Sequence, residues 1–212
     1  MDGVIFEGKN FWLELHRLMG TEKQAWQLWT GLGAHAYGQL SDLTARNLWR
    51  QKSADQFWRL IAARRLVTGI EQVFHYLNEH KIQTAIISSG PYQLAEKAQE
   101  LFSIREIRAN KLGIGPDGMF TGEVEVQVDD NSKDIPAREL MAKLGASYET
   151  TAMIGDASSD IPIARLVALS IAYDSAESGL PDVCSHRVVK GEMWKVVDLL
   201  QQRRPQAIYQ AG

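Results

Sequence analysis

The sequence predicts an α/β fold with a mostly parallel sheet, and three observations lead to this prediction. From residue 67 onward, short apolar runs alternate with helix-like segments. Polar residues follow several of these runs, as they often do where parallel strands end. Residues 9–64, in contrast, carry five of the six tryptophans and show helical spacing with no convincing strand. We therefore expect a helical unit joined to an α/β core.

Composition excludes several classes of protein. The chain has 212 residues, 45% of them hydrophobic and 23% charged, which is typical of a globular protein. The net charge is -3 and no basic run is longer than a pair of arginines, so a nucleic-acid partner is not expected. No stretch approaches the roughly 20 apolar residues of a membrane span. The one cysteine, Cys184, excludes an internal disulfide framework and suits a cytoplasmic location.

The helical unit is predicted from its periodicity. Apolar side chains recur every three or four residues, as in Phe11, Trp12, Leu15 and Leu18. Ser41-Asp42 and Ser53 stand where N-caps are expected, before helices over 43–51 and 54–65. We interpret the tryptophans as the packing core of this unit.

The α/β part follows in order. We expect a helix over 70–80, a strand over 84–87, a helix over 92–102 and a strand over 104–109. Residues 112–127 predict a hairpin, with its turn at Gly115-Pro116-Asp117-Gly118. Further on we expect helices over 134–144, 161–167 and 192–202, and strands over 151–154, 169–172 and 186–189. Gly145 is a plausible stop for the first of these helices.

Two carboxylates follow the strand that ends at Gly155. Asp156 and Asp160 lie four residues apart, between a strand end and a helix start. Mg²⁺ prefers oxygen ligands and is commonly held by one or two carboxylates, so one can bind the ion while the other orients a lysine or a water. The alternative is that Asp160 binds no metal and only stabilises the start of the following helix, where a negative charge is favourable.

Ser88-Ser89-Gly90 ends another apolar run and precedes a helix. A hydroxyl and free backbone N–H groups at a helix start can bind a phosphate, although an ordinary strand-to-helix cap fits as well. Lys133 would neutralise charge if it lay in the same site. Asp2 would act as a hydrogen-bond acceptor or as an acid, according to its protonation.

These motifs come in an order that resembles the haloacid-dehalogenase superfamily of phosphatases, in its phosphoserine-phosphatase-like branch. The order is Asp2-Gly3-Val4, a helical insert, Ser88, Lys133 and Gly155-Asp156 with Asp160. The resemblance implies a Rossmannoid three-layer core with a parallel sheet, made by residues 1–8 and 66–212. It also implies a helical cap over residues 9–65, inserted after the first motif.

The resemblance implies roles for individual residues in Mg²⁺-dependent hydrolysis of a phosphomonoester through an aspartyl-phosphate. Asp2 is the expected acid/base, with its carbonyl on Mg²⁺, and Asp156 and Asp160 are the expected metal carboxylates. Ser88, Ser89, Gly90 and Lys133 are expected to bind the phosphoryl group. For phosphoserine itself, Arg46 or Arg50 would bind the carboxylate and Glu7 the amine.

The family's first motif also contains a nucleophilic aspartate, two residues before the acid/base. In this numbering it falls directly before Met1, on a strand that the sequence does not include. Alternatives therefore stay open: a catalytically incomplete protein of this fold that acts as a binding module, or a phosphotransferase or mutase. The expected partner is a small phosphorylated metabolite, and the sequence leaves the oligomeric state open.

Overall fold

Two three-stranded sheets form the core of the computed structural model, which describes residues 1–8, 10–175 and 179–203. The first sheet has the order β1 (Ala85–Pro91), β2 (Glu106–Ile114), β3 (Phe120–Glu125), with β1–β2 parallel and β2–β3 antiparallel. The second sheet is parallel throughout, in the order β4 (Ala152–Gly155), β5 (Leu169–Tyr173), β6 (His186–Val188). The predicted α/β class with parallel strands is confirmed.

The two sheets are not joined by a strand ladder within the described residues. The single parallel sheet that the sequence suggested is thus present as two parts, β1–β3 and β4–β6. Buried side chains from both parts still belong to one large apolar cluster, for example Ile86 of β1 and Ile171 of β5. Packing, rather than backbone hydrogen bonding, holds the two parts together.

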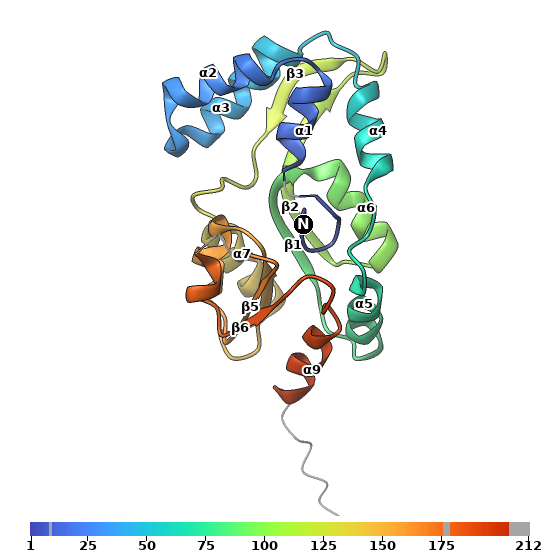
Figure 1. Cartoon of the computed structure of the whole chain (residues 1–212), viewed down its shortest axis with the longest axis vertical. Helices are drawn as coiled ribbons and strands as arrows, with labels where there is room; N and C mark the ends of the chain where they lie inside the picture. The colour runs from blue at the N-terminus through green and yellow to red at the C-terminus, as the bar shows by residue number, and fades with distance from the viewer. Residues whose placement is uncertain (9, 176–178, 204–212) are drawn as a thin grey trace, which may run out of the picture.

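Helices of the core alternate with these strands. They are α5 (Ile70–Glu79), α6 (Tyr92–Phe102), α7 (Asp134–Leu144), α8 (Ile161–Ala164) and α9 (Lys195–Gln202). Figure 1 shows α5 and α6 on one side of β1 and β2, with α7, β5 and β6 on the other. Gly145 ends α7 with a φ of 64°, the left-handed conformation expected of a helix stop.

Residues 11–63 are largely helical, as predicted. They form α1 (Phe11–Leu18), α2 (Glu22–Leu32), a 3-10 turn (Ala34–Ala36), α3 (Tyr37–Leu43), a π-helical turn (Thr44–Trp49) and α4 (Asp55–Ala63). These helices gather at one end of the molecule (Figure 1). Within the described residues, no helix has both the length and the apolar character that crossing a membrane would require. The cap and core boundaries at residues 8 and 66 stay a prediction.

The predicted N-cap at Ser41-Asp42 is wrong. Both residues lie inside α3, where the Ser41 hydroxyl donates to the Tyr37 carbonyl, 2.9 Å away. A hydroxyl can make this bond back to the preceding turn inside a helix as readily as it can cap one. Ser53, in contrast, lies just before α4 and its hydroxyl accepts a hydrogen bond from the Asp55 amide at 3.1 Å.

The hairpin β2–β3 connects the core to the helical unit. Its turn closes through the Gly118 amide, which donates to the Gly115 carbonyl at 3.0 Å. The segment before α4 pairs with β3, because the Gln51 amide donates to the Phe120 carbonyl and the Phe120 amide to the Lys52 carbonyl, both at 2.9 Å. The predicted hairpin is therefore confirmed. Its strand β3 contacts the helical unit through the backbone of residues 51 and 52.

Candidate active site

The first three residues lie between two segments that were predicted to be functional: the one that contains Ser88 and Gly90 and the one that contains Asp156. A side chain on Gly3 would collide with the Asp156 carboxylate, and Gly3 itself has a φ of +74°. A Cβ on Gly90 would come within 2.9 Å of the Met1 side chain and 3.1 Å of the Ser88 hydroxyl. Residues 1–3 therefore lie against the end of β1 on one side and the end of β4 on the other. In Figure 1 the N-terminus is accordingly found near the middle of the molecule.

Asp2 has a carboxylate that is only half satisfied. Its Oδ2 accepts a hydrogen bond from the Phe11 amide at 3.0 Å, at the start of α1. Its Oδ1 is buried and has no hydrogen-bond partner within the described structure. Burial raises the pKa of Asp2 above its usual value. A carboxyl group with a raised pKa and a free oxygen can exchange a proton with a ligand.

Ser88, Ser89 and Gly90 lie near the end of β1, just before its last residue, Pro91, and the start of α6. Ser88 is buried, at 8% exposure, and its hydroxyl accepts a hydrogen bond from the Gly90 amide at 3.1 Å. The Ser89 carbonyl receives three side-chain donors, which lie 2.8 to 3.1 Å away: Trp12 Nε1, Tyr37 Oη and Asn110 Nδ2. The conformation of this loop is thus fixed by the helical unit and by β2.

Lys133 is buried beside carboxylates. Its Nζ lies 2.9 Å from Asp160 Oδ1, 2.8 Å from the Ser159 hydroxyl and 3.6 Å from Asp130 Oδ1. Burial alone would lower the pKa of Lys133, but the charges of Asp160 and Asp130 outweigh it and raise the pKa. Lys133 therefore keeps a fixed positive charge.

Asp160 and Asp156 differ in their surroundings. Burial would raise the pKa of Asp160, but the Lys133 charge and its hydrogen bond lower it. Its Oδ2 also accepts from the amides of Asp156 and Ala157, at 3.1 and 3.2 Å. Burial, followed by the charge of Asp160, raises the pKa of Asp156 to about 6. The Asp160 carboxylate is thus bound by Lys133 and by backbone amides of the protein. The negative charge of Asp156 is only partly balanced by its surroundings.

The residues present fit a hard cation. Asp156 and Asp2 are partly desolvated carboxyl groups, the charge of Asp2 raises the pKa of Asp156, and Asp2 Oδ1 is a buried oxygen without a hydrogen-bond partner in the described structure. Within the described residues, no three acidic, His or Cys side chains converge as a complete cage. Mg²⁺ commonly uses one or two carboxylates and takes its other ligands from water and substrate, so an incomplete cage suits it.

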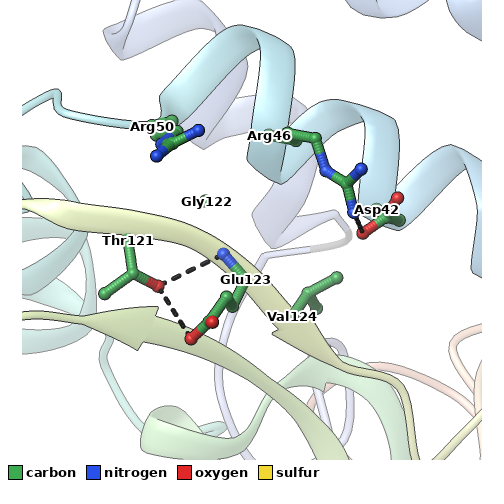
Figure 2. A pocket seen from close by; sticks show the side chains of 7 residues that line it. All are labelled: Asp42, Arg46, Arg50, Thr121, Gly122, Glu123 and Val124. Carbon is green, nitrogen blue, oxygen red and sulfur yellow. Dashed lines mark hydrogen bonds and ion pairs between the residues drawn. The ribbon is translucent and has the colours of Figure 1, made fainter.

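Arg46, Arg50 and Glu7 lie elsewhere. Arg46 pairs with Asp42 at 3.0 Å, and Arg50 packs its stem over Gly122, where a Cβ would come within 3.0 to 3.1 Å of it. Both arginines line a pocket of about 350 Å³ against β3 (Figure 2). Its walls include none of Asp2, Ser88, Lys133, Asp156 and Asp160. Glu7 pairs with Arg65 at 3.2 Å. Their proposed contacts with a substrate stay predictions.

Sequence reasoning missed the residues that hold this centre in place. Asn110 is buried in β2, at 1% exposure, and its side chain contacts the Ser89 carbonyl, the Val128 carbonyl and the amides of Gln127 and Val128. Neither Asn110 nor Asp130 carried a signal in the sequence. Asn110 falls between the predicted strand over 104–109 and the predicted hairpin over 112–127, with Arg108 and Lys111 close by, and asparagine is uncommon within strands.

A model of the haloacid dehalogenase-like hydrolase family matches residues 1–167, which is most of the chain. The chain belongs to this family. Among curated relatives, it is 30% identical over 106 residues to phosphoserine phosphatase of Methanocaldococcus jannaschii, covering 50% of each chain. It is 28% identical over 125 residues to the inhibition of morphological differentiation protein of Streptomyces azureus, covering 57% of this chain and 43% of the relative.

Solved structures of haloacid dehalogenase-like hydrolases share the fold. A substrate-bound phosphoserine phosphatase complex aligns with a TM-score of 0.77 and 20% identity, over 94% of both chains. A phospho-aspartyl intermediate analogue of phosphoserine phosphatase aligns equally well. At this identity the likeness shows the fold alone. The chain spans half or less of the length of the curated relatives that it matches.

Proposed function

We propose that this protein hydrolyses phosphomonoesters, with a catalytic centre like that of phosphoserine phosphatases. The observation that carries the proposal is the position of residues 1–3, which lie against both Gly90 and Asp156. This position supports the proposal that an acid/base candidate, a serine-rich loop and a lysine-carboxylate pair act as one polar centre. The match to a hydrolase family supports hydrolysis over a binding role or a phosphoryl transfer to another metabolite.

The proposed binding of the phosphoryl group uses the end of β1 and the cation of Lys133. The Ser88 hydroxyl and backbone N–H groups around Ser89 and Gly90 donate to phosphoryl oxygens. Lys133, held by Asp160 at 2.9 Å, offsets the negative charge that accumulates on these oxygens during transfer. Positioning and charge compensation supply most of the catalysis in reactions of this type.

The proposed metal is Mg²⁺. Asp156, with the carboxyl group or the carbonyl of Asp2, would hold it, and Asp160 would support it through Lys133 or a water. When bound, the ion supplies positive charge that compensates the phosphate and the carboxylates. This assignment is supported by the buried, unpartnered Asp2 Oδ1 and by the raised pKa of Asp156.

The proposed chemistry has two steps, as in the family. A carboxylate oxygen attacks phosphorus, the ester P–O bond breaks, and Asp2 gives its proton to the departing alkoxide. Water then attacks the aspartyl-phosphate while Asp2 takes up the proton, which releases inorganic phosphate and restores the carboxylate. The resemblance assigns the nucleophile to the position directly before Met1. The substrate is proposed to be a small phosphorylated metabolite of the cytoplasm.

Phosphate release from a panel of phosphomonoesters tests this proposal. It should be measured with Mg²⁺ for the 212-residue chain and for a form extended at its N-terminus by an apolar strand ending in Asp before Met1. We expect Mg²⁺-dependent turnover by the extended form, lost in Asp2→Asn and Lys133→Met. Protein that is incubated with a phosphate-labelled ester and then quenched with acid should retain the label as an acyl-phosphate. Failure of both forms to release phosphate from any ester would contradict the proposal.

A further inference from the structure

A second cavity, of about 100 Å³, lies between the helical unit and the hairpin. Its apolar walls come from α1, α3, the π-helical turn and the two hairpin strands: Trp12, Tyr37, Leu40, Trp49, Leu112 and Val124. The rings of Trp12 and Trp49 lie 6.0 Å apart at one side. Within the described lining there is no Asp, Glu, Lys or Arg.

The cavity adjoins the loop that is proposed to bind the phosphoryl group. Three of its lining residues, Trp12, Tyr37 and Asn110, donate hydrogen bonds to the carbonyl of Ser89, next to Ser88. Trp12 also follows Phe11, whose amide binds Asp2. A phosphoryl group held at Ser88 would therefore lie close to this cavity, and α1 connects the cavity wall to Asp2.

The polar groups on the walls already have partners in the protein. Ser41 donates to the Tyr37 carbonyl at 2.9 Å, and His16 Nδ1 lies 2.7 Å from the Thr21 hydroxyl. Asn110 uses its amide on Ser89 and on the Val128 backbone. Burial lowers the pKa of His16 to about 4, so its ring is neutral at pH 7. The free surface of the cavity is apolar.

Arg46 and Arg50 do not bring a positive charge into the apolar cavity. Arg46 is turned toward Asp42, and Arg50 lies over Gly122, both in the other pocket (Figure 2). Val124 alone is shared by the linings of the two pockets. An ammonium or a carboxylate placed in the apolar cavity would lose its hydration without gaining a partner there, which is costly for a charged group.

We propose that the cavity receives the alcohol portion of the substrate, and that this portion is a short, uncharged, apolar chain of about four carbon atoms. The size follows from comparison with the roughly 150 Å³ cavity that holds benzene in an engineered protein. This inference rests on the proposed function, because it takes the phosphoryl group to lie at Ser88. It favours alkyl phosphates over phosphorylated amino acids as substrates.

Binding of n-alkylphosphonates to the 212-residue chain with Mg²⁺, measured by calorimetry, tests the inference without requiring turnover. Each buried methylene should tighten binding about three- to fourfold. We therefore expect the Kd to fall about 30-fold or more from methyl- to butylphosphonate and to change little beyond it. The amino-acid phosphonate 2-amino-4-phosphonobutyrate should bind more weakly than butylphosphonate. A Kd independent of chain length, or tighter binding of the amino acid, would overturn the inference.

A pair of variants on α3 provides the matched control. Leu40→Asn removes an apolar wall and should weaken butylphosphonate binding about five- to tenfold, with methylphosphonate unaffected. Leu43→Asn makes the same change on the same helix outside the lining and should leave both affinities unchanged. Equal effects of the two variants would contradict the assignment of the cavity. Circular dichroism would check that both variants fold.

Hydrolysis assays separate the two proposals. Preferential binding of butylphosphonate without hydrolysis of any phosphomonoester, in either form of the chain, would overturn the proposed function and leave the cavity as a binding site for an apolar chain next to Ser88. Hydrolysis of phosphoserine with a higher kcat/KM than butyl phosphate would overturn the inference and keep the function. Failure to bind any phosphonate would overturn both.

Discussion

Lys133 and Asp160 illustrate how single residues set the electrostatics of this site. Both are buried, at 6% and 9% exposure, and their 2.9 Å contact is completed by Ser159 and by two amides on Asp160. Removing one partner of such a pair leaves a buried charge, which typically costs about 3–5 kcal/mol. The pair therefore fixes a cation beside the proposed phosphoryl-binding position.

Gly155 keeps this pair in position. A Cβ there would lie 2.5 Å from Asp160 Oδ2 and 2.8 Å from its Cβ and Cγ. We expect Gly155→Ala to displace Asp160, to cost about 1–3 kcal/mol of stability and to lower kcat at least about tenfold. Urea unfolding and phosphate release measure the two effects. Gly31→Ala, in α2 with open space around it, should instead stabilise the protein by up to about 1 kcal/mol.

His16 predicts a specific pH dependence of stability. Its pKa is lowered by burial to about 4, against 6.5 when exposed, and the charge of Glu22 offsets this only in part. Between these values the unfolded chain binds more protons than the folded protein, so stability falls as the pH decreases from 6.5 to 4. The loss attributable to His16 should approach about 3 kcal/mol.

The comparison of wild type with His16→Gln isolates this contribution. The glutamine amide can still reach the Thr21 hydroxyl but does not titrate. In urea unfolding from pH 7.5 to 4, the free energy of unfolding of wild type should decrease relative to that of His16→Gln as the pH falls. A difference that stays constant across this range would contradict the assignment.

At the scale of elements, the sequence predicted periodic segments well and irregular ones poorly. Helices α6 and α7 match their expected ranges, because amphipathic spacing and terminal residues such as Pro91 and Gly145 are local signals. The extension of β1 through Ser88-Ser89-Gly90 was not expected, because the register with β2 shifts between Ile87 and Pro91 and pairing resumes only at Pro91 and Asn110, which no local preference indicates. The π-helical turn, in the segment predicted as a helix over 43–51, was likewise not expected, and the ring of its last residue, Trp49, lies 5.9 Å from that of Phe120.

The same distinction applies to the candidate site. Ser88, Asp156 and Asp160 could be chosen from the sequence because they follow predicted strands, whereas Asp2 and Lys133 could be chosen only through the order of motifs that resembles the family. Their supporting partners could not. The three donors to the Ser89 carbonyl come from residues 21 to 77 positions away in the chain, and only the tertiary structure brings them together.

Phe120 is the main apolar link between the hairpin and the helices. Its ring lies 5.9 Å from those of Trp49 and Phe57, and its amide and carbonyl pair with residues 51 and 52. We expect Phe120→Ala to cost about 3–5 kcal/mol, in urea unfolding followed by tryptophan fluorescence. Glu125→Gln, at an exposed position of the same strand, should change stability by less than about 0.5 kcal/mol.

At the scale of the whole molecule, the candidate site lies where the two sheets meet without hydrogen-bonding to each other. Ser88 belongs to the first sheet, and Asp156 follows the last strand residue of β4 in the second. A ligand that contacts both would add a connection that the backbone of the described residues does not supply. Ligand binding should therefore stabilise the molecule as a unit.

Thermal unfolding with Mg²⁺ and inorganic phosphate tests this expectation. At about 100 times the Kd, binding contributes about 2.7 kcal/mol, which should raise Tm by about 5–10 °C for a chain of this size. Neither component alone should give the full shift, because phosphate without Mg²⁺ adds charge beside the carboxylates. An equal Tm with and without both ligands would contradict a joint site.

Asp156→Asn is the informative control. The raised pKa of Asp156 means that its ionised form is disfavoured in the folded protein at pH 7.5. Without metal, the asparagine variant should therefore be more stable than wild type, by up to about 2–3 kcal/mol. With Mg²⁺ and phosphate its Tm should change little. If Asp156→Asn were less stable than wild type in EDTA, the prediction would be wrong, because the folded protein would then stabilise the ionised form of Asp156.

The convergence of three donors on the Ser89 carbonyl has a consequence for the time course of a reaction cycle. Trp12 and Tyr37 belong to the helical unit, and Asn110 to the core. If the helices swing away to admit a substrate, two of the three donors must leave and water must replace them. Each turnover would then include breaking and remaking these two hydrogen bonds, a conformational step that is separate from the cleavage of the ester bond.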